Sequence, residues 1–291
     1  MATRALLAFL WLFHWLPLGL QAACGNAFGR LGYRLVSSRR KVALRNLELC
    51  FPELSEGERT ALAREHFAWL GRSLLERGLL WFAAPARLRQ LIHVEGDVEL
   101  AERSDRPVMW LGAHFVGLDI VGASILLFQK RRAVGIYQTQ SNPAMNEALL
   151  RGRLRLGNGE MYSRDDAGKR LFRAIRRGDG FLNFPDMDFG TRDAAFVPFF
   201  GIPAATLVAP SRLARALNMI VQPVMVDMLP GGQGYRVSFG EPWADFPGDD
   251  AVADSERMNR WIEAEIRRNP AQYLWVHRRF KTRPAGERSL Y

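Results

Sequence analysis

The amino-acid sequence predicts an α/β fold with a mostly parallel central sheet flanked by helices, preceded by an N-terminal membrane-anchoring helix. Short apolar runs typical of buried strands alternate with longer segments of helical character. A longer apolar run near the N-terminus has about the length that spans a bilayer as a helix. The rest of the chain contains no internal repeat and no low-complexity linker. We therefore expect residues 1–23 to form the anchor and residues 24–291 to form one α/β domain.

The N-terminal apolar run extends from Ala5 to Ala23 and is interrupted only by His14, Pro17 and Gln21. One interpretation is a cleaved signal peptide, since Arg4 precedes the run and small residues end it. The other is an uncleaved anchor or a membrane-embedded hairpin. The downstream flank favours the anchor, because positively charged flanks stay on the cytoplasmic side of a membrane. The basic residues of this flank are Arg30, Arg34, Arg39, Arg40, Lys41 and Arg45.

The first long helix after the anchor is marked by a capping box, in which Glu58 follows Ser55 by three residues, and it should cover residues 56–82. The apolar run Val-Met-Trp-Leu at 108–111 follows a polar stretch and predicts a buried strand. Further helices are expected over residues 117–128, 142–154, 165–177, 210–217 and 249–268. Further strands are expected over residues 134–137, 181–184, 220–228 and 235–239. In such a fold the functional residues gather in loops beyond the strand ends.

The composition restricts the possible classes of function but does not identify one of them. The formal net charge is +10, so anionic partners are favoured: nucleic acid, anionic lipid, a phosphorylated substrate or an acidic carrier protein. The two cysteines, Cys24 and Cys50, indicate neither a disulfide framework nor a cysteine-based zinc site. The sequence contains no H-E-x-x-H, no P-loop and no G-x-G-x-x-G, so we expect no metal and no organic cofactor.

The segment that carries chemistry is Leu-Gly-Ala-His-Phe-Val-Gly-Leu-Asp at 111–119, in which His114 and Asp119 are five residues apart. On a regular helix this spacing turns the two side chains apart by roughly 140°. They meet only if His114 lies in a loop before the helix and Asp119 in its first turns. Asp119 would then orient the imidazole, and the free ring nitrogen would take a proton from an attacking hydroxyl. A histidine after a strand is more often a packed or capping residue, so the spacing alone does not establish catalysis.

The context of this motif resembles a known family. The chain is similar to the late acyltransferases of lipid A biosynthesis, the lauroyl/myristoyl acyltransferase family within the glycerolipid acyltransferase superfamily, whose motif is H-x4-D/E. The matching segments, in chain order, are residues 45–52 (RNLELCFP), 112–115 (GAHF), 152–155 (GRLR), 184–190 (FPDMDFG), 196–200 (FVPFF) with 205–206 (AT), and 269–284 (NPAQYLWVHRRFKTRP). One departure is Asp119, where many members carry the longer glutamate.

The resemblance implies an O-acyltransferase (EC 2.3.1 type) that moves a fatty acyl chain from acyl carrier protein to a hydroxyl of a lipid A precursor. It implies His114 and Asp119 as the catalytic pair, and the substrate-binding candidates are Arg153, Asp186, Asp188, Arg278 and Arg279. The implied location is the bacterial inner membrane, with the catalytic domain facing the cytoplasm. Inner-membrane lipids are then partners and nucleic acid is not. His277 is interpreted as structural.

Two alternatives remain at this point. The first is an acyltransferase that acts on another membrane glycolipid or phospholipid by the same mechanism. The second is a non-enzymatic basic membrane protein that binds polyanions. The absence of a nucleic-acid-reading motif disfavours a nucleic-acid partner for the second.

Overall fold

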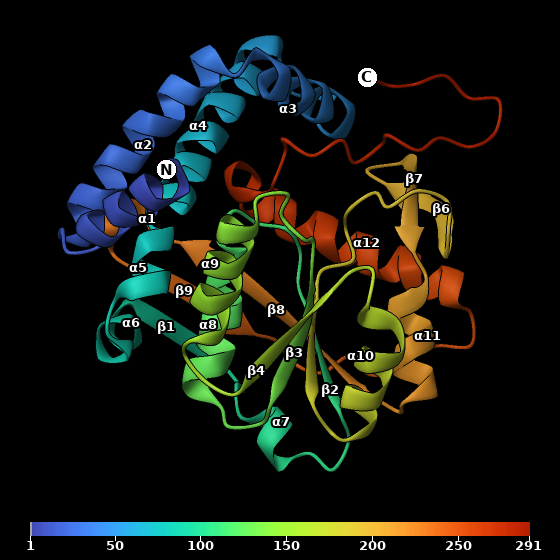
Figure 1. Ribbon diagram of the computed structural model, residues 1–291. Helices are drawn as coiled ribbons and strands as arrows, with labels where there is room; N and C mark the ends of the chain where they lie inside the picture. The colour runs from blue at the N-terminus through green and yellow to red at the C-terminus, as the bar shows by residue number, and fades with distance from the viewer. Residues whose placement is uncertain (1) are drawn as a thin grey trace.

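The computed structural model describes residues 2–291 and has a seven-stranded sheet at its centre, of order β1-β9-β8-β2-β5-β3-β4 (Figure 1). All neighbouring strands of this sheet are parallel except β8 and β9, which are antiparallel. This confirms the predicted α/β class and the mostly parallel sheet. The strands are β1 (Ile92–Gly96), β2 (Val108–Leu111), β3 (Ala133–Tyr137), β4 (Gly159–Ser163), β5 (Gly180–Asn183), β8 (Ile220–Met228) and β9 (Tyr235–Phe239), with a separate hairpin of β6 (Ala194–Phe199) and β7 (Ile202–Leu207).

Helices cover both faces of the sheet. They are α1 (Ala2–Phe13), α2 (Leu18–Leu35), α3 (Ser37–Cys50), α4 (Glu56–Leu75), α5 (Arg77–Phe82), α6 (Pro85–Leu91), α7 (Leu100–Arg103), α8 (Leu118–Phe128), α9 (Pro143–Leu154), α10 (Ala167–Arg176), α11 (Ala209–Ala216) and α12 (Ala251–Arg268). In Figure 1, α8 and α9 lie on the side of α5, whereas α10, α11 and α12 lie on the other side.

The central strand β2 shows why a continuous apolar run predicts a strand here. All four of its residues are buried, because helices cover both faces of the sheet. Val108 and Trp110 belong to the core on the α8 side, whereas Met109 and Leu111 belong to the core on the α10 side. The strand therefore ties two hydrophobic cores together and holds its C-terminal end in a fixed position.

The prediction that residues 1–23 form one membrane-anchoring helix is wrong. The apolar run is divided between α1 and α2, with a turn at residues 14–17. Pro17 has no backbone N–H, and it precedes the first residue of α2. Of the helices within residues 2–291, not one is both long enough and apolar enough to cross a membrane.

Two further differences concern the element boundaries. The capping box of Ser55 and Glu58 is present, but the helix expected over residues 56–82 is interrupted at Glu76 and continues as α5. Four strands were missed: β1, β4, β6 and β7. β1 and β4 are the edge strands of the sheet and are only partly buried, so their sequences lack the apolar run that marks a central strand.

Candidate active site

The loop after β2 carries His114 to the edge of the sheet where the parallel strands end. The β2–β5 ladder is extended beyond β2 by the N–H of Gly112, which donates to the carbonyl of Asn183 at 2.9 Å. Because β2 and β5 are parallel neighbours, the loops that follow them leave the sheet at the same edge. This topology brings His114 next to Asp186, which lies 72 residues further along the chain.

Asp186 is the carboxylate that holds the imidazole. Its Oδ1 lies 2.7 Å from Nδ1 of His114, and its Oδ2 accepts the backbone N–H of His114 at 2.9 Å. The side chain of Asp186 is fully buried, whereas that of His114 is 20% exposed. With Nδ1 donating to the carboxylate, Nε2 is left as the basic nitrogen.

The charge of Asp186 is stabilised by this contact. Burial alone would raise the pKa of its carboxyl group, but the His114 ring and backbone N–H, with a further contribution from Arg279, lower that pKa below its usual value. An ionised, buried carboxylate that fixes the imidazole is the arrangement needed for a general base.

The predicted hydrogen bond between His114 and Asp119 is wrong, because in residues 2–291 no hydrogen bond joins these two side chains. Asp119 lies in the first turn of α8, as expected, but its Oδ1 accepts from Nε of Arg153 at 2.8 Å. Its Oδ2 lies 3.2 Å from Nη2 of Arg77. Burial alone would raise the pKa of Asp119, but Arg153 and Arg77 lower it. Asp119 therefore organises two guanidinium groups rather than the imidazole.

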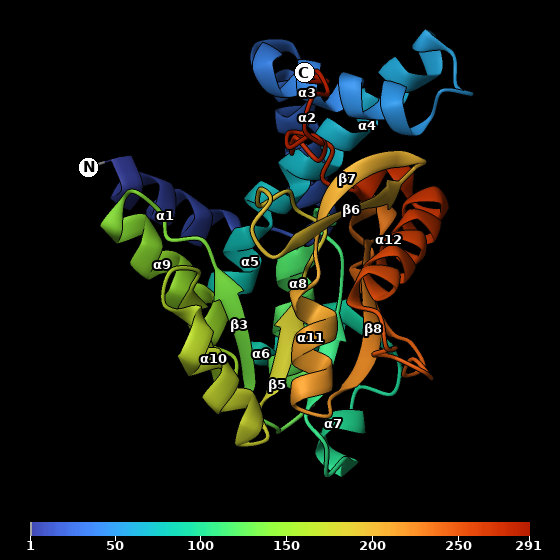
Figure 2. The same cartoon turned by 90° about the vertical axis from the view of Figure 1, so that its right-hand side faces the viewer.

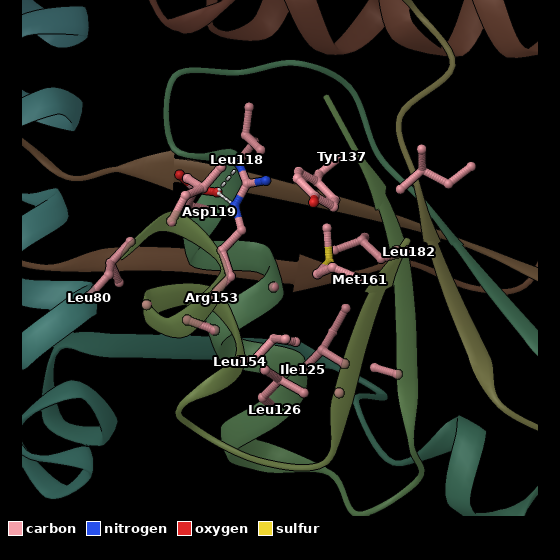
Figure 3. A pocket seen from close by; sticks show the side chains of 18 of the residues that line it. Leu80, Leu118, Asp119, Ile125, Leu126, Tyr137, Arg153, Leu154, Met161 and Leu182 are labelled. Carbon is pink, nitrogen blue, oxygen red and sulfur yellow. Dashed lines mark hydrogen bonds and ion pairs between the residues drawn. The ribbon is translucent and has the colours of Figure 1, made fainter. Parts of the chain in front are cut away.

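His114 and the cluster of Asp119, Arg77 and Arg153 nevertheless line the same cavity, of about 420 Å³. This size lies within the range of small-molecule sites, roughly 300–1,000 Å³. Figure 3 shows Arg153 pointing at Asp119 in one part of the cavity, and Ile125, Leu126 and Leu154 in another. Away from the charged cluster the wall is mainly apolar and is formed by α8, α9, β3 and β4. The cavity thus combines a charged, hydrogen-bonding part with an apolar part.

The cavity wall beside His114 is formed by Phe184, whose position requires a glycine at residue 112. The ring of Phe184 lies 5.4 Å from the imidazole, between ring centroids, and also lines the cavity. A Cβ at Gly112 would lie 2.5 Å from the Phe184 ring, so only glycine permits this contact.

The matching segment at residues 269–284 holds the loop of His114 in place through backbone hydrogen bonds. The N–H of Val116 donates to the carbonyl of Gln272 at 2.8 Å, and the N–H of Leu274 donates to the carbonyl of His114 at 2.9 Å. The matching segment at residues 45–52 supports this C-terminal segment, because the amide of Asn46 donates to the carbonyls of Trp275 and His277, each at 2.7 Å. The matching segments at 112–115, 184–190 and 269–284 therefore meet at His114, and the segment at 45–52 supports the last of them.

The other substrate-binding candidates lie apart from the cavity lining. Asp188 is buried and accepts hydrogen bonds from the backbone N–H and hydroxyl of Thr282, at 2.6 and 2.7 Å. Arg279 is also buried, and it donates to the carbonyl of Ala205 and the hydroxyl of Thr206. Arg278 is exposed, 5.8 Å from the ring centroid of Tyr291. Asp188 and Arg279 were predicted to contact substrate, but both are buried and bond to other parts of the protein, which indicates that they support the fold around the site.

His277 behaves as a structural histidine. Its Nε2 accepts the backbone N–H of Asp188 at 3.1 Å, and burial, more than the surrounding charges, lowers its pKa to about 4. The neutral ring fits a hydrogen-bond acceptor that joins the β5–β6 loop to the C-terminal segment. Arg77, in contrast, was missed as a site residue. It lies within a predicted helix of ordinary composition, and only the packing of α5 near α8 and α9 reveals its position.

A partly exposed histidine with a buried carboxylate partner, in the lining of a mainly apolar pocket, is a site suited to acyl transfer. Comparison with known proteins agrees with this class. Residues 2–282 match the family described as bacterial lipid A biosynthesis acyltransferase, and the chain belongs to this family. It is therefore an acyltransferase.

Named relatives cover most of the chain. It is 35% identical over 288 residues to the lipid A biosynthesis palmitoleoyltransferase of Escherichia coli. The aligned region covers 98% of this chain and 92% of the relative. It is 35% identical to the lauroyltransferase of the same organism (97% and 92% covered) and 31% identical to its myristoyltransferase (90% and 81% covered). Among solved structures, a 1-acyl-sn-glycerophosphate acyltransferase from Thermotoga maritima matches at 14% identity with a TM-score of 0.38, covering 84% of this chain and 94% of that one. That likeness is too weak to carry an argument.

Proposed function

We propose that this protein transfers a fatty acyl chain from acyl carrier protein to a hydroxyl of a lipid A precursor, with His114 as the general base and Asp186 as its orienting carboxylate. The observation that carries the mechanism is the pair of contacts from Asp186 to the ring and backbone of His114. The substrates are proposed from family membership and from the names of the relatives. The location that follows is the cytoplasmic face of the inner membrane, where the lipid substrate is available.

In the proposed reaction the acceptor hydroxyl gives its proton to Nε2 of His114 as its oxygen attacks the thioester carbonyl carbon. An ester C–O bond forms and the C–S bond breaks. The departing thiolate takes the proton from the imidazolium, so the enzyme returns to its starting state. Asp186 stabilises the imidazolium without accepting its proton.

The cluster of Asp119, Arg77 and Arg153 supplies positive charge beside the base. Two guanidinium groups share one carboxylate, so the cluster carries a net charge of one positive unit. In a partly buried site such a charge stabilises the oxyanion of an acyl-transfer intermediate or holds an anionic group of the acceptor. The net charge of +10 also attracts an acidic carrier protein and an anionic lipid surface.

The apolar part of the cavity is the proposed place for the acyl chain. Gly122 lies one turn beyond Asp119 on α8 and lines this part. An added Cβ there would meet only Leu182, at 3.8 Å, so a larger side chain would enter the cavity without a backbone clash.

Gly122→Leu is therefore expected to shift the preferred donor towards shorter acyl chains. The ratio of kcat/KM for the longest accepted chain to that for a shorter one should fall by at least about tenfold, since a single methylene changes such ratios by about 10–200-fold. Gly168→Leu is the matched control, because Gly168 is an exposed helical glycine with no atom within 4 Å of an added Cβ. An equal shift in both variants would contradict this assignment of the pocket.

The overall function is tested by mass spectrometry of lipid A from cells with and without this protein. The expected result is a lipid A that lacks one acyl group when the protein is absent. A purified assay that offers the same acyl group on acyl carrier protein or on coenzyme A then identifies the donor. Unchanged lipid A, together with no transfer to the isolated precursor, would rule out the proposed substrate.

A further inference from the structure

The two backbone hydrogen-bonding groups of His114 are held by two different parts of the fold. Its N–H donates to Oδ2 of Asp186, which lies on the loop after β5. Its carbonyl accepts the N–H of Leu274, which lies on the segment that follows α12. Asp186 therefore sets the direction of the imidazole, whereas the position of the His114 backbone depends also on where Leu274 lies.

The segment that follows α12 pairs with the His114 loop as a short antiparallel bridge. Phe115 and Tyr273 are the paired residues, and the N–H of Val116 donates to the carbonyl of Gln272 at 2.8 Å. Figure 2 shows α12, from which this segment continues, beside the β6–β7 hairpin. The bridge can fix the loop only if the segment is itself attached to the body of the protein.

The side chain of Gln272 provides this attachment. It is buried at the end of a short 3₁₀ turn (Pro270–Gln272), and its amide group makes two hydrogen bonds with Met228, the last residue of β8. The backbone N–H of Met228 donates to Oε1 at 2.9 Å, and Nε2 donates to the carbonyl of Met228 at 2.9 Å. The amide thus takes the place that the peptide group of a neighbouring strand would occupy.

The end of β8 needs such a partner because its neighbour β2 is shorter. β2 ends at Leu111 and pairs with β8 only from Ile220 to Pro223, whereas β9 continues to pair with β8 as far as Met228. Met228 is buried, so backbone groups that β2 leaves unpaired must find another partner. Gln272 fills this position and thereby ties the loop that continues β2 back to the strand from which β2 has separated.

We infer that Gln272 is a positioning residue for the reaction, whose side-chain amide fixes the loop of His114 relative to the end of β8. This inference rests on the proposed role of His114 as the general base. Gln272 is not among the residues that line the cavity, so it acts through the backbone bridge and not on the substrate. Without the amide, the segment and the loop would shift together, and the imidazole would move relative to Asp186 and the cavity.

The groups proposed to bind substrate are carried by other elements. Arg77 lies on α5 and Arg153 on α9, and their carboxylate partner Asp119 lies on α8. A shift of the His114 loop should therefore lower the rate of transfer more than it weakens the binding of substrate.

Gln272→Met is expected to lower kcat by about tenfold to a hundredfold with little change in KM, because misplacing a reacting group by about 1 Å costs up to about a hundredfold. Methionine has a similar length but has no amide to pair with Met228. The matched control is Gln222→Met. Gln222 is also buried on β8, but its Nε2 donates to the carbonyls of Asp97 and Gly240, away from the His114 loop.

Both variants lose buried hydrogen bonds and some stability, so their rates are compared at a temperature at which both are folded. The control should keep a kcat close to that of the wild type. An equal loss of kcat in the two variants, or a loss in Gln272→Met that appears only in KM, would overturn the inference.

A spectroscopic readout separates positioning from stability. The ring N–H that faces Asp186 at 2.7 Å should give a downfield proton resonance, which is identified by its absence from His114→Ala. This resonance should shift or broaden in Gln272→Met and stay in place in Gln222→Met. An unchanged resonance in Gln272→Met would overturn the inference. The readout does not use acyl transfer, so the inference can fail while the proposed function stands.

A second variant tests the same coupling if Gln272→Met does not fold. Replacing Leu274 by its α-hydroxy acid keeps the side chain but turns the N–H that donates to His114 into an ester oxygen. The matched control is the same replacement at Leu217, whose N–H donates to the carbonyl of Leu213 at the end of α11. The ester at Leu274 should lower kcat and shift the His114 resonance, whereas the ester at Leu217 should do neither. A wild-type rate with the ester at Leu274 would overturn the inference.

Discussion

Replacing His114 by alanine is expected to lower the rate of acyl transfer by about 10²–10⁴-fold, the usual contribution of a positioned general base. The acceptor hydroxyl would then have no group to take its proton as it attacks the thioester. The measurement is the initial rate of transfer with purified protein at saturating concentrations of both substrates. Since the fully buried Asp186 would lose its ring partner, the melting temperature should fall as well, so the rate is measured at a temperature at which the circular dichroism spectrum shows the variant to be folded.

His93→Ala is the matched control for this variant. His93 is an exposed histidine on the edge strand β1, so its replacement changes the histidine content without touching the cavity. It should retain the wild-type rate. If His114→Ala also retained that rate while remaining folded, the general-base mechanism would be wrong.

The sequence selected His114 as the candidate base but paired it with Asp119, whereas the structure pairs it with Asp186. The spacing of His114 and Asp119 is a local signal, visible within nine residues. The contact with Asp186 is made across 72 residues and depends on β2 and β5 being parallel neighbours, which no local pattern specifies. The family resemblance of residues 184–190 did place Asp186 among the candidate site residues, but it did not indicate that Asp186 contacts His114. Asp119 and Arg153 do meet in the structure, so both belong to the site in a different pairing.

The strands that were predicted and those that were missed differ for the same reason: some are specified by their own sequence and others by their neighbours in the sheet. Central strands such as β2 and β8 are buried on both faces and therefore carry an apolar run that the sequence reveals. The edge strands β1 and β4 are partly exposed, and their strand character depends on the neighbour that pairs with them. The N-terminal run is apolar, and Pro17 within it marks the break between α1 and α2. The hydrogen bonds that Arg87, in α6, donates to the carbonyls of this turn come from more than 60 residues beyond Ala23 and could not be read from the run itself.

Asp186→Asn is expected to reduce kcat by about 10²–10⁴-fold with little change in KM, because the base would lose its orientation. In the wild type, one carboxylate oxygen accepts the ring N–H of His114 and the other accepts its backbone N–H. An asparagine offers only one acceptor oxygen, so one of these two donors loses its partner. The amide N–H2 would also face the ring or the backbone N–H, which favours the wrong tautomer or moves the loop.

Asp119→Asn is the comparison that separates the two carboxylates. This substitution leaves the His114–Asp186 contact in place but removes the negative charge that Arg77 and Arg153 share. We therefore expect a higher KM for the acceptor and a smaller loss of kcat than in Asp186→Asn, measured under the same conditions. If Asp119→Asn instead lost more of kcat than Asp186→Asn, the imidazole would be oriented by Asp119 during the reaction. The pairing with Asp186 would then describe only the resting enzyme, because the lowered pKa of both carboxyl groups keeps either one available as an anion at neutral pH.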